Sequence, residues 1–110
     1  MLDNTHDPQV LHKDQYGYLV YCPCCYGFQL SYGTFYINQS LADLESFADL
    51  IYRYYQKFAN REEQRRRDIY LETPYAGFGL LFSARDLEIL NTMLQSGLLL
   101  LSSKDTVSHQ

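Results

Sequence analysis

Alternating apolar and polar residues predict several short β-strands. In residues 27–32, Phe28 and Leu30 have one parity, while Gln29 and Ser31 have the other. This period of two is typical of a strand with one buried face. Gly33 then allows the tight turn of a hairpin. The aromatic and β-branched content, or the same alternation, predicts further strands over residues 16–22, 35–39, 69–73 and 78–82.

A first helix is predicted from Ser40 to about Asn60. Ser40 and Asp43 have the spacing of an N-cap and a first-turn acid. Apolar residues then recur at steps of three and four, which indicates one buried face: Leu41, Leu44, Phe47, Ala48, Ile51, Tyr55 and Phe58, flanked by Leu50 and Tyr54. No helix breaker follows before Asp68, so a charged extension of the helix or a charged loop is expected over residues 61–68.

A second helix is predicted to begin after Ser83, with Asp86 as its first-turn acid. Its core stripe is Leu87, Leu90 and Leu94, with Ile89 and Met93 to one side. Gly97 is suited to end this helix in a left-handed conformation. The apolar run 98–101 would then form a last strand, a helix end or an extended segment packed at an interface.

The two helix starts belong to a possible internal repeat with an offset of 43 positions. The offset aligns Ser40, Asp43, Leu44 and Glu45 with Ser83, Asp86, Leu87 and Glu88, and Tyr32 and Phe35 with Tyr75 and Phe78. Each copy would be a ββα unit.

The predicted fold is α+β, with the order β-β-β-α-β-β-α. An antiparallel sheet of about five strands would carry both helices on one face. Residues 1–15 are expected to form a flexible arm, 16–102 a single domain and 103–110 a flexible tail. The predicted core is Leu19, Phe28, Leu30, Phe35, Ile37, Leu44, Phe47, Ile51, Leu71, Phe78, Leu80, Leu87, Leu90 and Leu94.

Composition narrows the classes of protein that this chain can belong to. The 110 residues carry a net charge of −4, which does not favour binding to nucleic acid or to an anionic membrane surface. Residues 1–15 lack the apolar segment of a signal peptide, and the run 98–101 is too short to span a bilayer. The three cysteines lie within four positions, so they cannot staple distant segments, and a reducing cytoplasmic setting is expected.

The segment Cys22-Pro23-Cys24-Cys25 is the one motif that suggests site chemistry. Cys22 and Cys25 have the spacing of a zinc knuckle at a hairpin tip, and Cys24 would be a third ligand. A complete tetrahedral site needs further ligands, which a second chain would supply. The alternatives are a turn with only a structural role and a redox thiol, although a redox Cys usually begins a helix rather than a strand.

No enzyme motif accompanies the cysteines. The chain lacks a P-loop, a G-x-S-x-G and an H-E-x-x-H sequence, and its three histidines, His6, His12 and His109, fall in the predicted arms. One basic face of the first helix, formed by Arg53, Lys57, Arg61 and Arg65, would be an anion site, but interleaved glutamates weaken its field. The tyrosines of residues 16–36 suggest base stacking, yet no basic residue follows Lys13 in that stretch.

As a whole the pattern resembles a small uncharacterised bacterial family defined as a domain of unknown function. In that family a C-x-x-C precedes an apolar strand, a glycine turn and a capped helix. The matching positions are Cys22, Cys25, Phe28, Leu30, Gly33 and Phe35, followed by residues 83–94. Tyr26 departs from the glycine that is commoner there. The resemblance implies this fold and the cysteine turn, and it implies no activity.

The function remains unknown from the sequence, with two hypotheses. The first is a small non-enzymatic binding or adaptor module, and the alternative is a zinc-binding or thiol-redox protein that uses Cys22 and Cys25. A homodimer is expected in either case, because the supply of apolar residues exceeds what one small sheet and two helices can bury. The residues expected at that interface are Leu50, Tyr54, Ile89, Met93 and 98–101.

Overall fold

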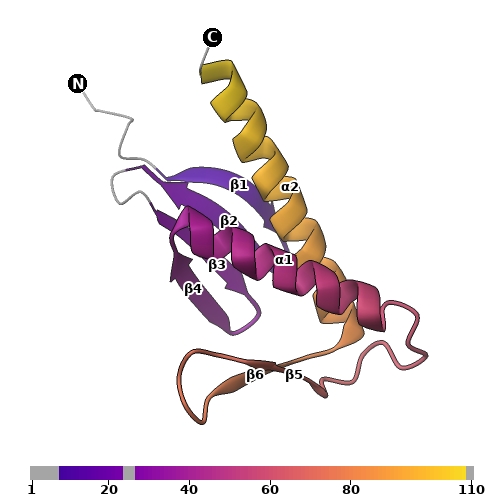
Figure 1. The fold of residues 1–110 in the computed structure, drawn as a ribbon. Coiled ribbons are helices and arrows are strands. Elements are labelled where there is room, and N and C mark those ends of the chain that lie inside the picture. The colour runs from indigo at the N-terminus through magenta and orange to yellow at the C-terminus, as the bar shows by residue number, and fades with distance from the viewer. Residues whose placement is uncertain (1–7, 24–26, 109–110) are drawn as a thin grey trace.

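The computed structural model describes residues 8–23 and 27–108, which form six strands and two helices (Figure 1). The elements follow in the order β1 (Gln9–Asp14), β2 (Gly17–Cys22), β3 (Gly27–Tyr32), β4 (Phe35–Gln39), α1 (Leu41–Phe58), β5 (Ile69–Glu72), β6 (Gly79–Phe82) and α2 (Ala84–Ser108). All strand pairs are antiparallel. The predicted α+β class with two helices is therefore confirmed, but the single five-stranded sheet is wrong. The described strands form a four-stranded sheet, β1-β2-β3-β4, and a separate two-stranded sheet, β5-β6.

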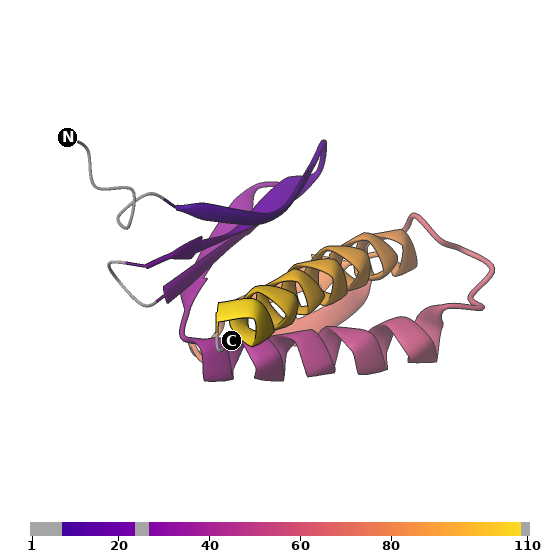
Figure 2. The ribbon, with the colours of Figure 1, turned by 90° about the horizontal axis from the view of Figure 1, so that it is seen from above.

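Both helices lie on the same side of the four-stranded sheet, as the view from above shows (Figure 2). Alternate residues of the strands face the helices, among them Leu19 and Leu30, which are fully buried partners on β2 and β3. The helices bury Leu44, Ile51, Leu87, Leu90, Met93 and Leu94 against them. No helix of the described residues covers the other face of the sheet (Figure 2).

Strand β1 corrects the flexible arm predicted over residues 1–15. Leu11 is buried although its neighbours are mostly exposed, and a β-bulge between Val10 and His12 turns this residue toward the core. The Asp14 carboxylate accepts hydrogen bonds from the backbone amides of Tyr16 (2.8 Å) and Gly17 (3.2 Å) and so closes the β1–β2 turn. Only one large apolar residue of β1 faces inward. The alternation of apolar and polar residues is therefore too weak to predict this strand from the sequence.

Helix α1 begins where predicted and ends at Phe58. The Ser40 side chain accepts a hydrogen bond from the Asp43 amide at 3.2 Å, which confirms the N-cap. After Phe58 the chain turns, and the Gln64 side-chain amide donates to the Ala59 carbonyl at 3.3 Å. The helical extension toward residue 68 does not form, because the apolar stripe stops at Phe58 and a long polar helix end has nothing to pack against.

Helix α2 continues through Gly97 to Ser108, so the predicted stop at Gly97 is wrong. Within the predicted tail of residues 103–110, the described part up to Ser108 is helical. Gly97 is buried because the helix crosses the sheet there. A Cβ atom at this position would lie 2.5 Å from Leu19 Cδ2 and 3.4 Å from Leu11 Cβ. The glycine therefore permits close helix–sheet approach rather than a left-handed cap, and residues 98–101 are helical.

The β5–β6 hairpin changes one assignment in the predicted core. Ile69, Leu71 and Phe82 point inward, whereas Phe78 is 55 % exposed in the connection between the strands. The predicted core position for Phe78 is therefore wrong. A connection of six residues, 73–78, separates β5 from β6, and it ends the strand alternation before it reaches Phe78.

The two halves agree at the helix starts and differ elsewhere. Helices α1 and α2 begin 43 positions apart, and each has a serine whose hydroxyl accepts a hydrogen bond from the amide three residues later. Tyr32 is buried in the larger sheet, whereas its counterpart Tyr75 is 74 % exposed. A common origin of the two ββα units stays a prediction.

Candidate functional site

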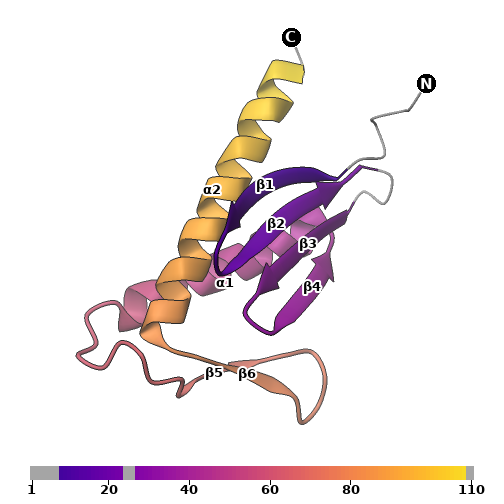
Figure 3. The same ribbon diagram turned by 180° about the vertical axis from the view of Figure 1, so that it is seen from behind.

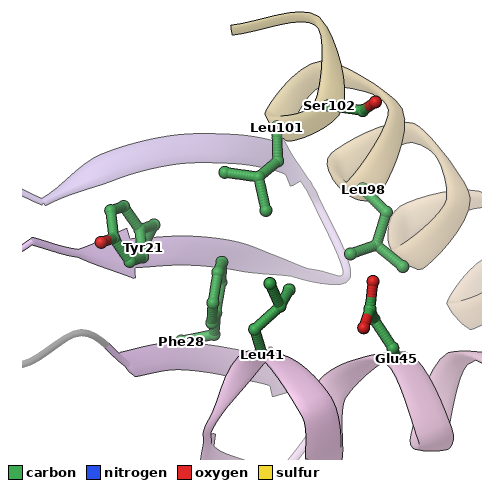
Figure 4. Close-up of a pocket in the computed structure, with 7 residues that line it drawn as sticks. All are labelled: Tyr21, Phe28, Leu41, Glu45, Leu98, Leu101 and Ser102. Carbon is green, nitrogen blue, oxygen red and sulfur yellow. The ribbon is translucent and has the colours of Figure 1, made fainter. Parts of the chain in front are cut away.

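An apolar groove with a volume of about 520 Å³ lies between the start of α1, the second half of α2 and the sheet (Figure 4). We call it the α1–α2 groove. Its lining consists of Tyr21, Phe28, Leu41, Glu45, Leu98, Leu101 and Ser102. The side chains come from β2, β3, α1 and α2, so the groove forms only when the second helix packs near the sheet and the first helix.

Regular secondary structure places each of these side chains. Tyr21 and Phe28 are cross-strand partners on the helix-facing side of β2 and β3, with ring centroids 4.8 Å apart. Leu41 and Glu45 are one turn apart on α1, and Leu98 and Leu101 share a face of α2.

Among the side chains that the structure describes, Glu45 is the only charged one that lines the α1–α2 groove. Within the part of the chain that the structure describes, its carboxylate has no hydrogen-bond or ion-pair partner. One carboxylate among leucine and aromatic side chains does not provide the positioned acid and base, or the nucleophile and base, that catalysis requires. The groove is suited to hold an apolar surface.

Exposed leucines stand next to the groove on α2. Leu99 is 70 % exposed and Leu100 is 38 % exposed. Two of the residues predicted at a dimer interface lie elsewhere in the fold. Met93 is fully buried within its own chain, and Ile89 packs against the core. Leu99 and Leu100 lie on the second half of α2, which extends past the sheet (Figure 3). A second group of exposed apolar residues lies on the β5–β6 hairpin and its connection: Tyr70, Tyr75, Phe78 and Leu81.

A cluster of hydrogen bonds around Asp86 connects three segments of the chain. Arg67 donates from Nε and Nη2 to the two carboxylate oxygens, at 2.8 and 3.3 Å, and the Tyr32 hydroxyl donates to Oδ1. The Ser83 amide donates to Oδ2 at 2.8 Å, while the Asp86 amide donates to Ser83 Oγ at 3.0 Å. The last pair is a reciprocal capping box at the start of α2.

Burial and hydrogen bonding in this cluster shift the pKa values of Asp86 and Tyr32. Burial acts to raise the pKa of Asp86, but the hydrogen bonds from Arg67, Tyr32 and Ser83 outweigh it and lower that pKa to about 2. Burial and the adjacent carboxylate raise the pKa of the Tyr32 phenol above its usual range. Asp86 therefore stays ionised and Tyr32 stays protonated near neutral pH, which is the state of a structural tie rather than of a general acid or base.

The sequence identified only half of this cluster. Ser83 and Asp86 were recognised as capping residues, but nothing in their spacing indicated Arg67 or Tyr32 as partners. The Asp86 carboxylate is buried, whereas its repeat counterpart Asp43 is exposed.

The predicted basic face on α1 does not form. Arg61 and Arg65 lie beyond the end of the helix. Arg53 pairs with Asp49 at 3.1 Å, and Arg61 pairs with Asp68 at 2.5 Å. The anion site proposed for this face is therefore wrong.

The cysteine motif is described only in part. Cys22 ends β2, is half-buried and is paired in register with Gly27 on β3. Cys24 and Cys25 lie outside the described residues, as do His6 and His109, while the His12 ring is 2.9 Å from the Asp14 carboxylate. Among the side chains that the structure describes, no group of three or more His, Cys, Asp or Glu residues is placed to hold a metal ion.

The α+β architecture, the apolar groove and the capped second helix define a small α+β domain. Comparison with family models matches residues 4–105 to a family of unknown function (DUF6686). The chain belongs to this family, which confirms the expected membership of an uncharacterised domain family. No curated protein and no solved structure matches the chain. Within the described residues, no helix is long and apolar enough to cross a membrane.

Proposed function

We propose that the protein is a small non-enzymatic binding module that works as a homodimer in the cytoplasm. The observation that carries this proposal is the position of two exposed leucines, Leu99 and Leu100, beside the α1–α2 groove. An exposed apolar patch next to an apolar groove is the usual mark of a protein–protein contact. The three clustered cysteines support a reducing compartment.

A second copy of the chain would fit this surface if the surface is complementary to itself. The α2 helix provides both parts, with Leu98 and Leu101 in the groove and Leu99 protruding next to them. In a two-fold symmetric dimer the same patch meets itself, so each copy supplies one protrusion and one groove. Leu99 of one copy would thus fill the groove of the other.

Light scattering at micromolar concentration tests the dimer. The unmodified chain should have twice the mass of one chain, and Leu99→Glu should have the mass of one chain, because a carboxylate cannot enter the apolar groove without a partner. Leu81→Glu is the matched control, since Leu81 is 57 % exposed on β6, away from the groove. A monomeric unmodified protein, or a dimer lost only in Leu81→Glu, would contradict the proposal.

Zinc binding is the second candidate, favoured by the register of the β2–β3 hairpin. The pair Cys22 and Gly27 closes the ladder, so only residues 23–26 connect the two strands, as a zinc knuckle requires. Cys22, Cys24 and Cys25 would supply ligands, and the dimer partner would complete the site.

Elemental analysis of protein purified without added metal distinguishes the two candidates. Zinc at half or full stoichiometry, lost when both Cys22 and Cys25 are replaced by Ser, would support the metal site. Protein free of zinc, with unchanged stability in that double variant, would leave the binding module alone.

A further inference from the structure

A second groove lies between edge strand β4, helix α1 and the β5–β6 hairpin. We call it the β4 trough. Its volume is about 720 Å³, and its apolar base is formed by Ile37, Phe47, Leu50, Leu71 and Leu80. The trough opens on the side of α1 that carries Asp43 and Phe47, whereas the α1–α2 groove uses Leu41 and Glu45. The two surfaces are therefore separate.

One wall of the trough is a strand with a free edge. Strand β4 pairs with β3 on one side and with no other strand in the described chain. The β5–β6 hairpin lies on this side of the sheet (Figures 1 and 3), and the ring centroids of Phe35 and Phe82 are 6.2 Å apart there. Alternate residues of an edge strand direct their backbone N–H and C=O groups outward, so β4 can accept an additional strand.

The charged side chains that line the trough in the described chain are acidic. Asp43 and Glu72 line it. Among the described residues no lysine or arginine lines it, and neither carboxylate has a hydrogen-bond or ion-pair partner. Gln39 also lines it, and the buried Oε1 atom of Gln39 accepts no hydrogen bond from the described residues. The trough thus combines an apolar base, a free acceptor and two unpaired carboxylates.

We propose that the β4 trough binds an extended segment of another protein in which apolar and basic residues alternate. The segment would add to the edge of β4, place its apolar side chains on the base of the trough and direct Lys or Arg toward Asp43 and Glu72. Charge argues against the undescribed residues 1–7 of this chain as the occupant, because they carry Asp3 and Asp7. This proposal rests on the proposed role as a binding module. Its test uses residues outside the α1–α2 groove and away from Leu99 and Leu100.

Fluorescence anisotropy with a dye-labelled peptide of four Val-Lys repeats, blocked at both ends, tests the proposal. This probe should bind with a Kd below about 1 mM. Peptides of four Val-Glu or four Ser-Lys repeats should bind at least about tenfold more weakly, because the first has the wrong charge and the second lacks apolar side chains. Equal binding by the Ser-Lys peptide would mean unspecific attraction to an acidic protein and would overturn the proposal.

A double variant, Asp43→Asn with Glu72→Gln, should weaken binding of the Val-Lys peptide about threefold to tenfold, as expected for two rim charges. The matched control is Asp49→Asn with Glu62→Gln, which removes two exposed carboxylates outside the trough and should leave the Kd unchanged. Equal effects in both double variants would overturn the proposal.

Amide hydrogen exchange identifies the binding mode. Bound Val-Lys peptide should slow exchange of alternate amides within Phe35–Gln39, since a new strand covers the free edge. Unchanged exchange there would overturn strand addition. A changed mass of the unliganded Asp43 and Glu72 double variant in light scattering would instead mark the trough as a contact between copies, and would also overturn the proposal. Failure of the peptide with an intact dimer leaves the proposed homodimer standing.

Discussion

At the scale of single residues, Asp86 shows how burial and partners together decide what a side chain does. Its sequence position predicts only a helix cap, and the capping box is present. The fold adds Tyr32 from β3 and Arg67 from the segment before β5. A carboxylate with this many donors is costly to neutralise, so it links the two halves of the molecule most strongly when it is charged.

The free energy of unfolding should therefore fall in acid through Asp86. Its pKa is about 2 in the folded chain and near 3.8 when unfolded, so the contribution is complete above about pH 4 and is lost as pH falls toward 2. Its size is roughly 2 kcal/mol. Urea unfolding at pH 7 and at pH 2.5 measures it. In Asp86→Asn the drop between the two pH values should be smaller by that amount, and an equal drop would contradict the assignment.

Gly97 gives a second prediction at this scale. Glycine to alanine in a helix usually adds about 1 kcal/mol of stability. Here the new methyl group would lie 2.5 Å from Leu19 Cδ2, so the fully buried leucine must shift. Gly97→Ala should therefore destabilise the fold by about 1–3 kcal/mol in urea unfolding. Ser96→Ala, one residue away and exposed, is the control and should be neutral or slightly stabilising.

At the scale of elements, amphipathic periodicity was a reliable guide for helices and a weaker one for edge strands. The stripe of α1 places Leu44 and Ile51 in the core as predicted. Strand β1 was missed because it contributes one buried residue, Leu11, and reaches the core through a bulge. The end of α2 was misjudged because Gly97 has a packing role that local sequence does not reveal.

Alanine substitutions should lower the free energy of unfolding much more at core positions of the helices than in the β5–β6 connection. Leu44→Ala and Leu87→Ala each remove a fully buried side chain and should cost about 2–5 kcal/mol. Phe78→Ala should cost well under 1 kcal/mol, because Phe78 is more than half exposed. Chemical denaturation measures all three, and a large loss for Phe78→Ala would show that the hairpin connection packs more tightly than the structure indicates.

At the scale of the whole molecule, the shape is elongated. The Cα radius of gyration is 15.2 Å, compared with about 13 Å for a compact domain of this length, and the longest extent is 52 Å. The 25-residue α2 accounts for much of this, because it continues beyond the sheet and carries its exposed leucines with it.

A dimer through α2 should make thermal stability depend on protein concentration. Because association stabilises only the folded state, Tm should rise when the protein is concentrated from about 1 to 100 μM. Calorimetry or circular dichroism measures the shift. Leu99→Glu should abolish it while Leu81→Glu retains it, and a Tm independent of concentration in the unmodified chain would contradict the dimer.

The sequence by itself determined the class of fold, the two helices, their serine caps and most of the inward-facing residues. These features depend on local periodicity and capping, which a short window of residues contains. The tertiary structure decided the separation into two sheets, the path of α2 past Gly97, the tie between Tyr32, Arg67 and Asp86, and both grooves. Each of these depends on contacts between segments far apart in the chain, such as Leu19 against Gly97, and no local pattern of residues encodes which distant surfaces will meet.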